Sequence, residues 1–231
     1  MNRVILEPAF VLHSRPYRDT SLLVELLTAQ YGRLTVIARG ARSSRSHILT
    51  LFSPLLVSFS GKTDLQTLQQ VESNGLSYKL SGDILFSGFY LNELLMRLLH
   101  RHESHPNVYN LYQQTLNTLS CSEKPEFALR LFEKYLLADI GFGLQLDRTV
   151  NNEIVLEKEK YIFEFGTGLK KAKYEDLHNF SGKSLLALQS GVLNTPEVLK
   201  DTKRLLRSVF AILLGNKPLK SRELFEGKKL I

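Results

Sequence analysis

The chain has 231 residues, 43% hydrophobic and 23% charged, a composition that excludes a disordered or collagen-like protein. Thirty lysines and arginines against 23 acidic residues give a formal net charge of +7, which favours an acidic partner such as nucleic acid or an anionic membrane surface. The single cysteine, Cys121, excludes an intrachain disulfide and a cysteine-rich zinc site. No apolar run approaches the roughly 20 residues of a membrane span, so we expect no membrane association and a cytoplasmic location.

Five short apolar or alternating runs predict β-strands in the first 75 residues. They are residues 8–14, 20–28, 33–39, 53–60 and 65–72. Turn residues at Tyr31-Gly32 and at Gly61–Asp64 predict two tight connections between neighbouring strands. The count and lengths fit a five-stranded barrel of the OB-fold type, although an SH3-like barrel has a similar strand count. We therefore predict an OB-fold nucleic-acid-binding domain over residues 1–80.

Arginines concentrate in and after the third predicted strand. Segment 38–46, ARGARSSRS, carries Arg39, Arg42 and Arg45 between small residues that are expected to form no core. Period-two alternation places Arg33 and Arg39 together on one exposed face that continues into this segment. Guanidinium groups suit phosphate oxygens, so the four arginines predict a DNA-binding surface. A solvated linker with solubilising arginines is the alternative.

The first predicted turn extends this surface. Arg15 and Arg18 lie in SRPYRD (14–19) and are further DNA-binding candidates. Tyr17 between them is either a base-stacking platform or a side chain packed against the barrel rim.

From about residue 82 the apolar period changes to that of a helix. Helices are predicted over residues 82 to about 102, 107 to about 119, 125–140, 181–188 and 195–214, with a small hairpin near 148–180. We therefore predict a mainly α-helical domain over residues 81–231, and an α+β fold class for the chain. Basic residues on the last of these helices form either a second binding surface or a solvated face; they are Lys200, Lys203, Arg204 and Arg207.

The sequence contains no recognisable catalytic or metal motif. In HRHESH (100–105), His100 and His102 cannot share one helix face, and no phosphate-binding loop, nucleophile motif or acidic Mg²⁺ cluster is present. We therefore expect no enzyme, no cofactor and no metal. A nuclease, an RNA-binding module or a peripheral membrane module with the same basic surface are the alternatives.

Five stretches together resemble the RecO family of bacterial DNA repair and recombination mediators, in its enterobacterial form. They are AFVLHSRPYRDTSLLVELLT (9–28), GRLTVIARGARSSRS (32–46), YLNELLMRLL (90–99), PEFALRLFEKYLLADIGFG (125–143) and GNKPLKSRELF (215–225). The resemblance implies an OB-fold, a helical C-terminal domain and no catalysis. It also implies binding to single- and double-stranded DNA, annealing of complementary strands, and loading of RecA with RecR at the nucleoid. Some members carry a four-cysteine zinc site, but residues 141–180 lack cysteine, so we expect no zinc; we also expect a monomer.

The resemblance further implies a site for the acidic C-terminal tail of single-stranded DNA-binding protein. Because that tail ends in an aromatic residue with a free carboxylate, it needs an apolar pocket rimmed by cations. The candidate cations are Arg130, Lys217, Lys220 and Arg222, and the candidate pocket residues are Phe127, Leu131 and Tyr135. For residues 217–225 the alternative is a terminal helix that only caps the bundle.

Overall fold

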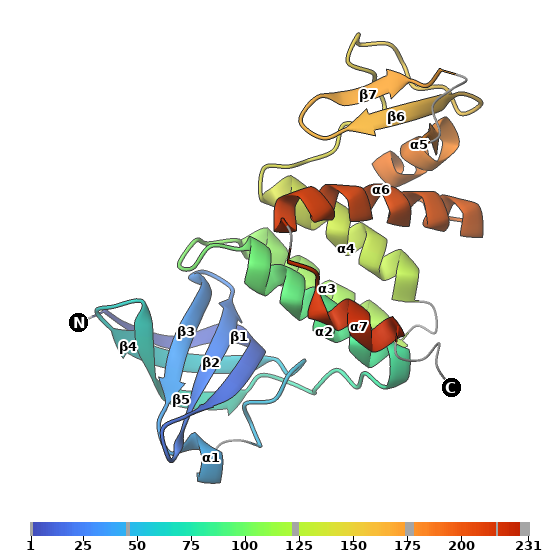
Figure 1. Ribbon diagram of the computed structural model, residues 1–231. Helices are drawn as coiled ribbons and strands as arrows, with labels where there is room; N and C mark the ends of the chain where they lie inside the picture. Colours follow the sequence, from blue (N-terminus) through green and yellow to red (C-terminus); the bar gives the residue numbers. More distant parts are fainter. Residues whose placement is uncertain (1, 45–46, 122–124, 174–177, 216, 227–231) are drawn as a thin grey trace. The chain divides into compact units, whose positions relative to one another are not determined.

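The computed structural model describes residues 2–44, 47–121, 125–173, 178–215 and 217–226 (Figure 1). Its contacts divide the chain into two units. The first unit comprises residues 1–123 together with 219–231, and the second comprises residues 124–218. The first unit therefore joins the N-terminal strands to several of the helices that follow them.

The first unit begins with a closed five-stranded barrel. Its strands are β1 (Asn2–Tyr17), β2 (Ser21–Thr28), β3 (Gly32–Ala38), β4 (Leu55–Gly61) and β5 (Leu65–Ser73). They follow the order β1-β2-β3-β5-β4, in which β3 and β5 are parallel and the other neighbours are antiparallel. This barrel is the predicted OB-fold, and the helices that follow confirm the α+β class.

β1 is longer than its predicted segment because it pairs with two neighbours. Its first half pairs with β4 and its second half with β2, and the register shifts once in each half. Such bulges bend a strand, so that β1 can serve both sides of the closing barrel. The inward-facing side chains form one core that includes Val11, Val24, Leu26, Leu34, Val36, Val57 and Phe59.

The connection between β3 and β4 starts with a short helix, α1 (Ala41–Ser44). The Arg42 N–H donates to the Thr20 carbonyl at 3.1 Å, which holds this turn on the barrel. Ala41 is consequently fully buried and belongs to the barrel core. The prediction that segment 38–46 contributes nothing to a core is therefore wrong at Ala41.

Three helices complete the first unit, namely α2 (Gly82–Leu98), α3 (Pro106–Cys121) and α7 (Lys220–Glu226). The Phe10 ring on the outer face of β1 contacts the rings of Tyr109 and Tyr112 on α3, with centroids 5.5 and 5.2 Å apart. On α2, the Asn92 amide donates to the Leu12 carbonyl at 2.9 Å and accepts from the Tyr112 hydroxyl at 2.6 Å. Aromatic packing and a buried polar bridge thus fix the helices on β1.

A carboxylate on α2 holds the first turn of α7. Glu93 accepts hydrogen bonds from the Lys220 N–H at 2.9 Å, the Ser221 N–H at 2.8 Å and the Ser221 hydroxyl at 2.6 Å. Burial raises the pKa of Glu93, but these hydrogen bonds together with Arg97 outweigh it. The pKa of Glu93 therefore lies below its ordinary value of 4.5.

Replacing Glu93 by glutamine is expected to lower the stability of the fold at neutral pH. A carboxyl group with a lowered folded-state pKa stabilises above its unfolded pKa, and this contribution is lost as pH falls through the folded value. The gap in urea midpoint between the two proteins should thus be constant near neutral pH and shrink below about 4.5. A gap that persists unchanged in acid would contradict this, and Glu223→Gln, an exposed site on α7, is the control.

The second unit combines three helices with a small sheet. Its elements are α4 (Pro125–Asp139), β6 (Lys160–Glu164), β7 (Gly168–Lys171), β8 (Phe180–Ser181), α5 (Gly182–Ser190) and α6 (Pro196–Leu214). The antiparallel pair of β6 and β7 is the hairpin predicted near 148–180. α6 starts where the Thr195 hydroxyl accepts the Val198 N–H, with Pro196 at its first position. In the described residues, no helix is both long and apolar enough to cross a membrane.

Candidate nucleic-acid interface

Four of the predicted DNA-binding arginines gather at one end of the barrel; they are Arg15, Arg18, Arg39 and Arg42, and we call them the arginine end. Arg15 near the end of β1 lies opposite Leu23 of β2, which in turn lies opposite Ile37 near the end of β3. Arg18 is in the β1–β2 turn, Arg39 directly follows β3, and Arg42 is in α1 at this end of the barrel (Figure 1). Arg45 lies outside the described residues.

The arginine end is exposed to solvent. All four side chains are exposed, and within the described parts of the chain none of them forms an ion pair. Arg42 Nη1 donates to the backbone carbonyl of Asp19 at 2.9 Å, which orders the guanidinium without neutralising it. The four positive charges therefore remain available to an external anion.

The β1–β2 turn carries backbone strain at Arg18. Its φ of +50° is uncommon for a residue with a Cβ atom and costs about 1–3 kcal/mol. The Arg18 guanidinium lies 5.3 Å from the centroid of the Tyr17 ring, a distance typical of a cation–π contact. Arg18 thereby covers one face of the half-buried Tyr17 ring.

Arg33 is not part of this surface. Its side chain is 14% exposed, its Nη1 lies 3.1 Å from Glu25 Oε2, and its Nε donates to the Leu99 carbonyl at 3.1 Å. Glu25 also accepts from Arg101 at 2.7 Å and from the Thr35 hydroxyl at 2.8 Å. The prediction of an exposed Arg33 is therefore wrong: alternation placed it correctly on the outer face, but the helical part of the same unit covers that face here.

The covering segment is residues 99–105, between α2 and α3. The predicted helix to about residue 102 ends early, because Leu99 turns to an extended conformation with φ −81° and ψ 132°. The His102 N–H then donates to the Arg33 carbonyl at 2.8 Å. Gly32 beneath it has φ +65°, and a Cβ there would lie 1.7 Å from the Glu103 carbonyl oxygen.

The histidines of this segment do not form a metal site. No group of three histidine, cysteine, aspartate or glutamate side chains in the described ranges is placed to hold a metal ion. The segment instead blocks part of the β2–β3 face through which OB-folds commonly bind polynucleotides. The residues of the arginine end lie in β1, the β1–β2 turn and the connection after β3, away from this covered position.

In the second unit, the candidate cation Arg130 is buried. It is 5% exposed, because it lies on the inner face of α4, where its Nη2 pairs with Glu133 Oε1 at 2.6 Å. Its Nε has no hydrogen-bond partner within the described structure. On the outer side of α4, Phe127 and Tyr135 are exposed and Leu131 between them is half-buried. These three residues, one helical turn apart from each other, form the α4 stripe.

The other candidate cations are distributed over both units. Lys217 is exposed in the second unit, whereas α7 of the first unit carries Lys220, which is exposed, and Arg222, which is half-buried. On α6, Lys203 pairs with Glu126, and Arg204 pairs with Asp201 at 3.1 Å. Lys200 and Arg207 are exposed.

Comparison with known proteins divides the chain between residues 75 and 81, where the structure changes from the barrel strands to the helices. The family model described as "Recombination protein O N terminal" matches residues 1–75, and that described as "Recombination protein O C terminal" matches residues 81–223. Proteins named "DNA repair protein RecO" are similar over almost their full length. The one from Coxiella burnetii (strain RSA 331 / Henzerling II) is 46% identical, covering 96% of this chain and 98% of the relative. That from Nitrosococcus oceani is 43% identical, with 97% and 94% covered, and that from Polynucleobacter necessarius 41%, with 99% and 98%.

Proposed function

The chain belongs to the RecO family of DNA repair proteins, and on this premise we propose that it is a non-enzymatic recombination mediator that binds single- and double-stranded DNA and anneals complementary strands. The observation that carries the proposal is the arginine end. Its four exposed guanidiniums, without carboxylate partners in the described chain, lie together at one end of the barrel.

Annealing brings two polyanions together, so a protein that neutralises both strands lowers their repulsion. Binding is driven by release of counterions when arginines replace them at the phosphates. Phosphate contacts carry no sequence information, so we expect little preference among DNA sequences. Neutralising the phosphates of two strands needs no catalytic group.

A nuclease with the same basic surface is the rival function, and incubation with labelled single- and double-stranded DNA in Mg²⁺ or Mn²⁺ separates the two. We expect retarded migration of both DNAs under native conditions and full-length strands on a denaturing gel. Shortened strands would contradict a binding-only function if the cleavage activity co-purifies with the protein through several columns. Competition with RNA and with anionic liposomes tests the remaining alternatives, and either competitor is expected to be weaker than DNA.

The proposal includes the protein partners that the family resemblance implies: the tail of single-stranded DNA-binding protein, and RecR in loading RecA, with this chain acting as a monomer. For the tail, the α4 stripe supplies an exposed apolar surface for an aromatic end group. Arg130 lies buried on the opposite face of α4, so the carboxylate of the tail needs another cation. The participation of Lys217, Lys220 and Arg222 stays a prediction.

Replacing Phe127 and Tyr135 together by alanine is expected to weaken binding of an acidic peptide with a C-terminal aromatic residue by about tenfold or more. The loss of two exposed aromatic contacts removes most of the apolar anchoring. Arg130 is left unchanged in this test because it is buried and paired with Glu133. Fluorescence anisotropy of a labelled peptide measures the affinity. Ile212→Ala, at an exposed apolar site on α6, is the control, and equal peptide affinity in all proteins would place the site elsewhere.

A further inference from the structure

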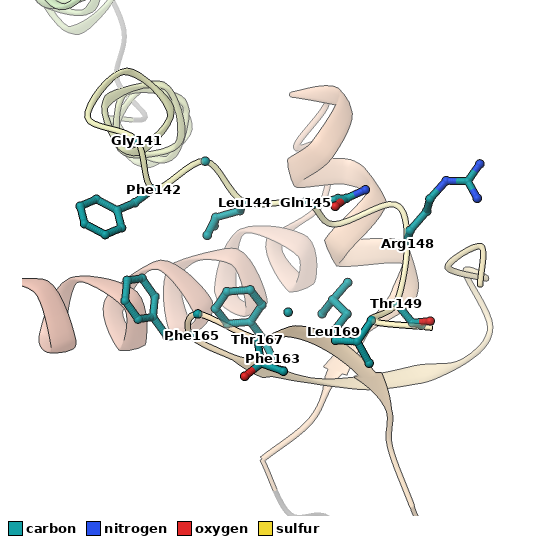
Figure 2. A pocket seen from close by; sticks show the side chains of 14 residues that line it. Gly141, Phe142, Leu144, Gln145, Arg148, Thr149, Phe163, Phe165, Thr167 and Leu169 are labelled. Atoms are coloured by element: carbon teal, nitrogen blue, oxygen red, sulfur yellow. The ribbon is translucent and has the colours of Figure 1, made fainter. Parts of the chain in front are cut away.

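The second unit contains an open groove between the end of α4 and the β6–β7 hairpin (Figure 2). Residues 141–145, 148–150, 163 and 165–169 line it, and its volume is about 320 Å³. This volume is at the lower end of the roughly 300–1,000 Å³ range of small-ligand pockets. The groove therefore has room for one flat group of a larger ligand.

Two phenylalanine rings form one side of the groove. The rings of Phe142 and Phe165 have centroids 5.8 Å apart and an angle of 30° between their planes, close to a parallel stack. Phe142 is 43% exposed, although aromatic rings normally gain most when buried. With Phe142 exposed and Phe165 half-buried, this nearly parallel pair is a platform on which a further planar ring can stack.

Each of the two rings is next to a glycine with a positive φ. Gly141 precedes Phe142 with φ +85°, and Gly166 follows Phe165 with φ +80°. A Cβ atom added at either position would meet nothing within 4 Å, so the positive φ, and not a lack of space, favours glycine there. The GFG and GTG segments are thus turns that present the rings.

The charge around the groove suits an extended polyanion. Arg148 is the one charged residue among those that line the groove in the described structure. Its Nη1 donates to the carbonyl and the side-chain oxygen of Asn152 at 3.2 and 3.3 Å, which fixes its direction. Figure 2 shows the guanidinium directed out of the cavity, on the side away from the rings of Phe142 and Phe165.

This separation distinguishes two ligands. A peptide with a C-terminal aromatic residue carries its carboxylate next to its ring and would leave that charge without a cation at the platform. In single-stranded DNA the bases present flat faces, and the phosphates lie along the outside of the strand, where they can reach Arg148. Stacking on aromatic side chains together with backbone cations is the usual way in which proteins bind single strands.

We propose that this groove binds a base of single-stranded DNA by stacking on Phe142 and Phe165, with Arg148 contacting a neighbouring phosphate. The inference rests on the proposed DNA-binding function and adds a second, stacking site to the electrostatic one at the arginine end. A site of this kind holds an unpaired base and has no affinity for a duplex, in which the bases are stacked already.

Because the chain contains no tryptophan, Phe165→Trp gives a single fluorescent reporter within the platform. Titration with an oligothymidylate is expected to quench its fluorescence, whereas an abasic strand of equal length leaves it unchanged. Phe142→Trp serves as a second reporter if the first variant fails to fold. The stacking site would be overturned if a labelled oligonucleotide still binds but does not quench the tryptophan. It would also be overturned if an acidic peptide with a C-terminal aromatic residue quenches the tryptophan and the oligonucleotide does not.

The affinity of the Phe142→Ala/Phe165→Ala variant provides an independent measure. We expect about tenfold weaker binding to single strands, unchanged binding to duplex DNA, and an unchanged salt slope, because stacking displaces no counterions. Ile154→Ala, which removes an exposed apolar side chain outside the groove, is the control. If single-strand affinity stays equal in all three proteins, the stacking site is refuted and the proposed function stands. If the unchanged protein binds no DNA, the proposed function itself fails.

Discussion

Replacing Arg15, Arg18, Arg39 and Arg42 together by alanine is expected to flatten the salt dependence of single-strand binding. The logarithm of affinity falls with the logarithm of salt concentration with a slope of about −0.7 per neutralised phosphate on single strands. If each arginine contacts one phosphate, the slope should become shallower by close to 3. All four side chains are exposed, so the fold should tolerate their loss. Titrations of a labelled oligonucleotide at several salt concentrations measure the slope.

A pair of double variants separates a local site from a general effect of charge. Arg39→Ala/Arg42→Ala and Lys200→Ala/Arg207→Ala each remove two exposed positive charges, the first pair at the arginine end and the second on α6. We expect a clear change in slope for the first and little change for the second. Equal changes would mean that net charge alone drives binding, and the arginine end would then have no special role.

Replacing Glu25 by alanine is expected to destabilise the first unit by about 3 kcal/mol, which is the larger of the two stability effects that we predict. The substitution leaves the guanidinium of Arg33 buried without its carboxylate, and a buried charge without a partner is costly. Burial already lowers the pKa of Arg33 below its ordinary value, whereas the negative charge of Glu25 raises this pKa. Urea unfolding gives the change in free energy, and Glu72→Ala on β5, an exposed carboxylate, is expected to cost less than about 0.5 kcal/mol.

The double variant Glu25→Ala/Arg33→Leu tests the cause of this loss. Removing both charges and filling the space with an apolar side chain should be milder than removing Glu25 alone, because no uncompensated charge remains. If the double variant is as unstable as the single one, the loss comes from packing and the ion pair has no special weight.

The elements of this fold could be predicted because each carries a local signal. Alternation in LLVELLT and RLTVIAR marks β2 and β3, and the Pro196 start of α6 follows an N-cap threonine. The five-strand count was enough for a barrel, although not for its order. The parallel pair of β3 and β5 that distinguishes the OB-fold is a contact between distant segments and leaves no periodic trace.

The predictions failed where a distant segment covers a strand. Alternation gives the face on which Arg33 lies, but whether that face meets water depends on residues 99–105. A signal was nevertheless present: Glu25 is a lone carboxylate within an apolar strand, and such a group requires a partner when buried. The loop residues gave a mixed result: Arg18, Arg39 and Arg42 are exposed as predicted, whereas Ala41 in the same segment is buried in the barrel core.

The groove of the second unit could not be predicted for a similar reason. Phe142 and Phe165 belong to separate segments of the region with the weakest periodicity, and only the fold brings their rings together. The glycines beside them indicated turns, but a turn alone does not show what its neighbours contact.

The central claim is that cations at the barrel end neutralise DNA backbones without breaking bonds. The rate of annealing of two complementary labelled strands coated with single-stranded DNA-binding protein tests it most directly, with the products examined on a denaturing gel. We expect the unchanged protein to accelerate annealing, the variant without the four arginines of the barrel end to lose most of that acceleration, and all strands to stay full-length. Undiminished annealing by this variant, or shortened strands, would contradict the claim.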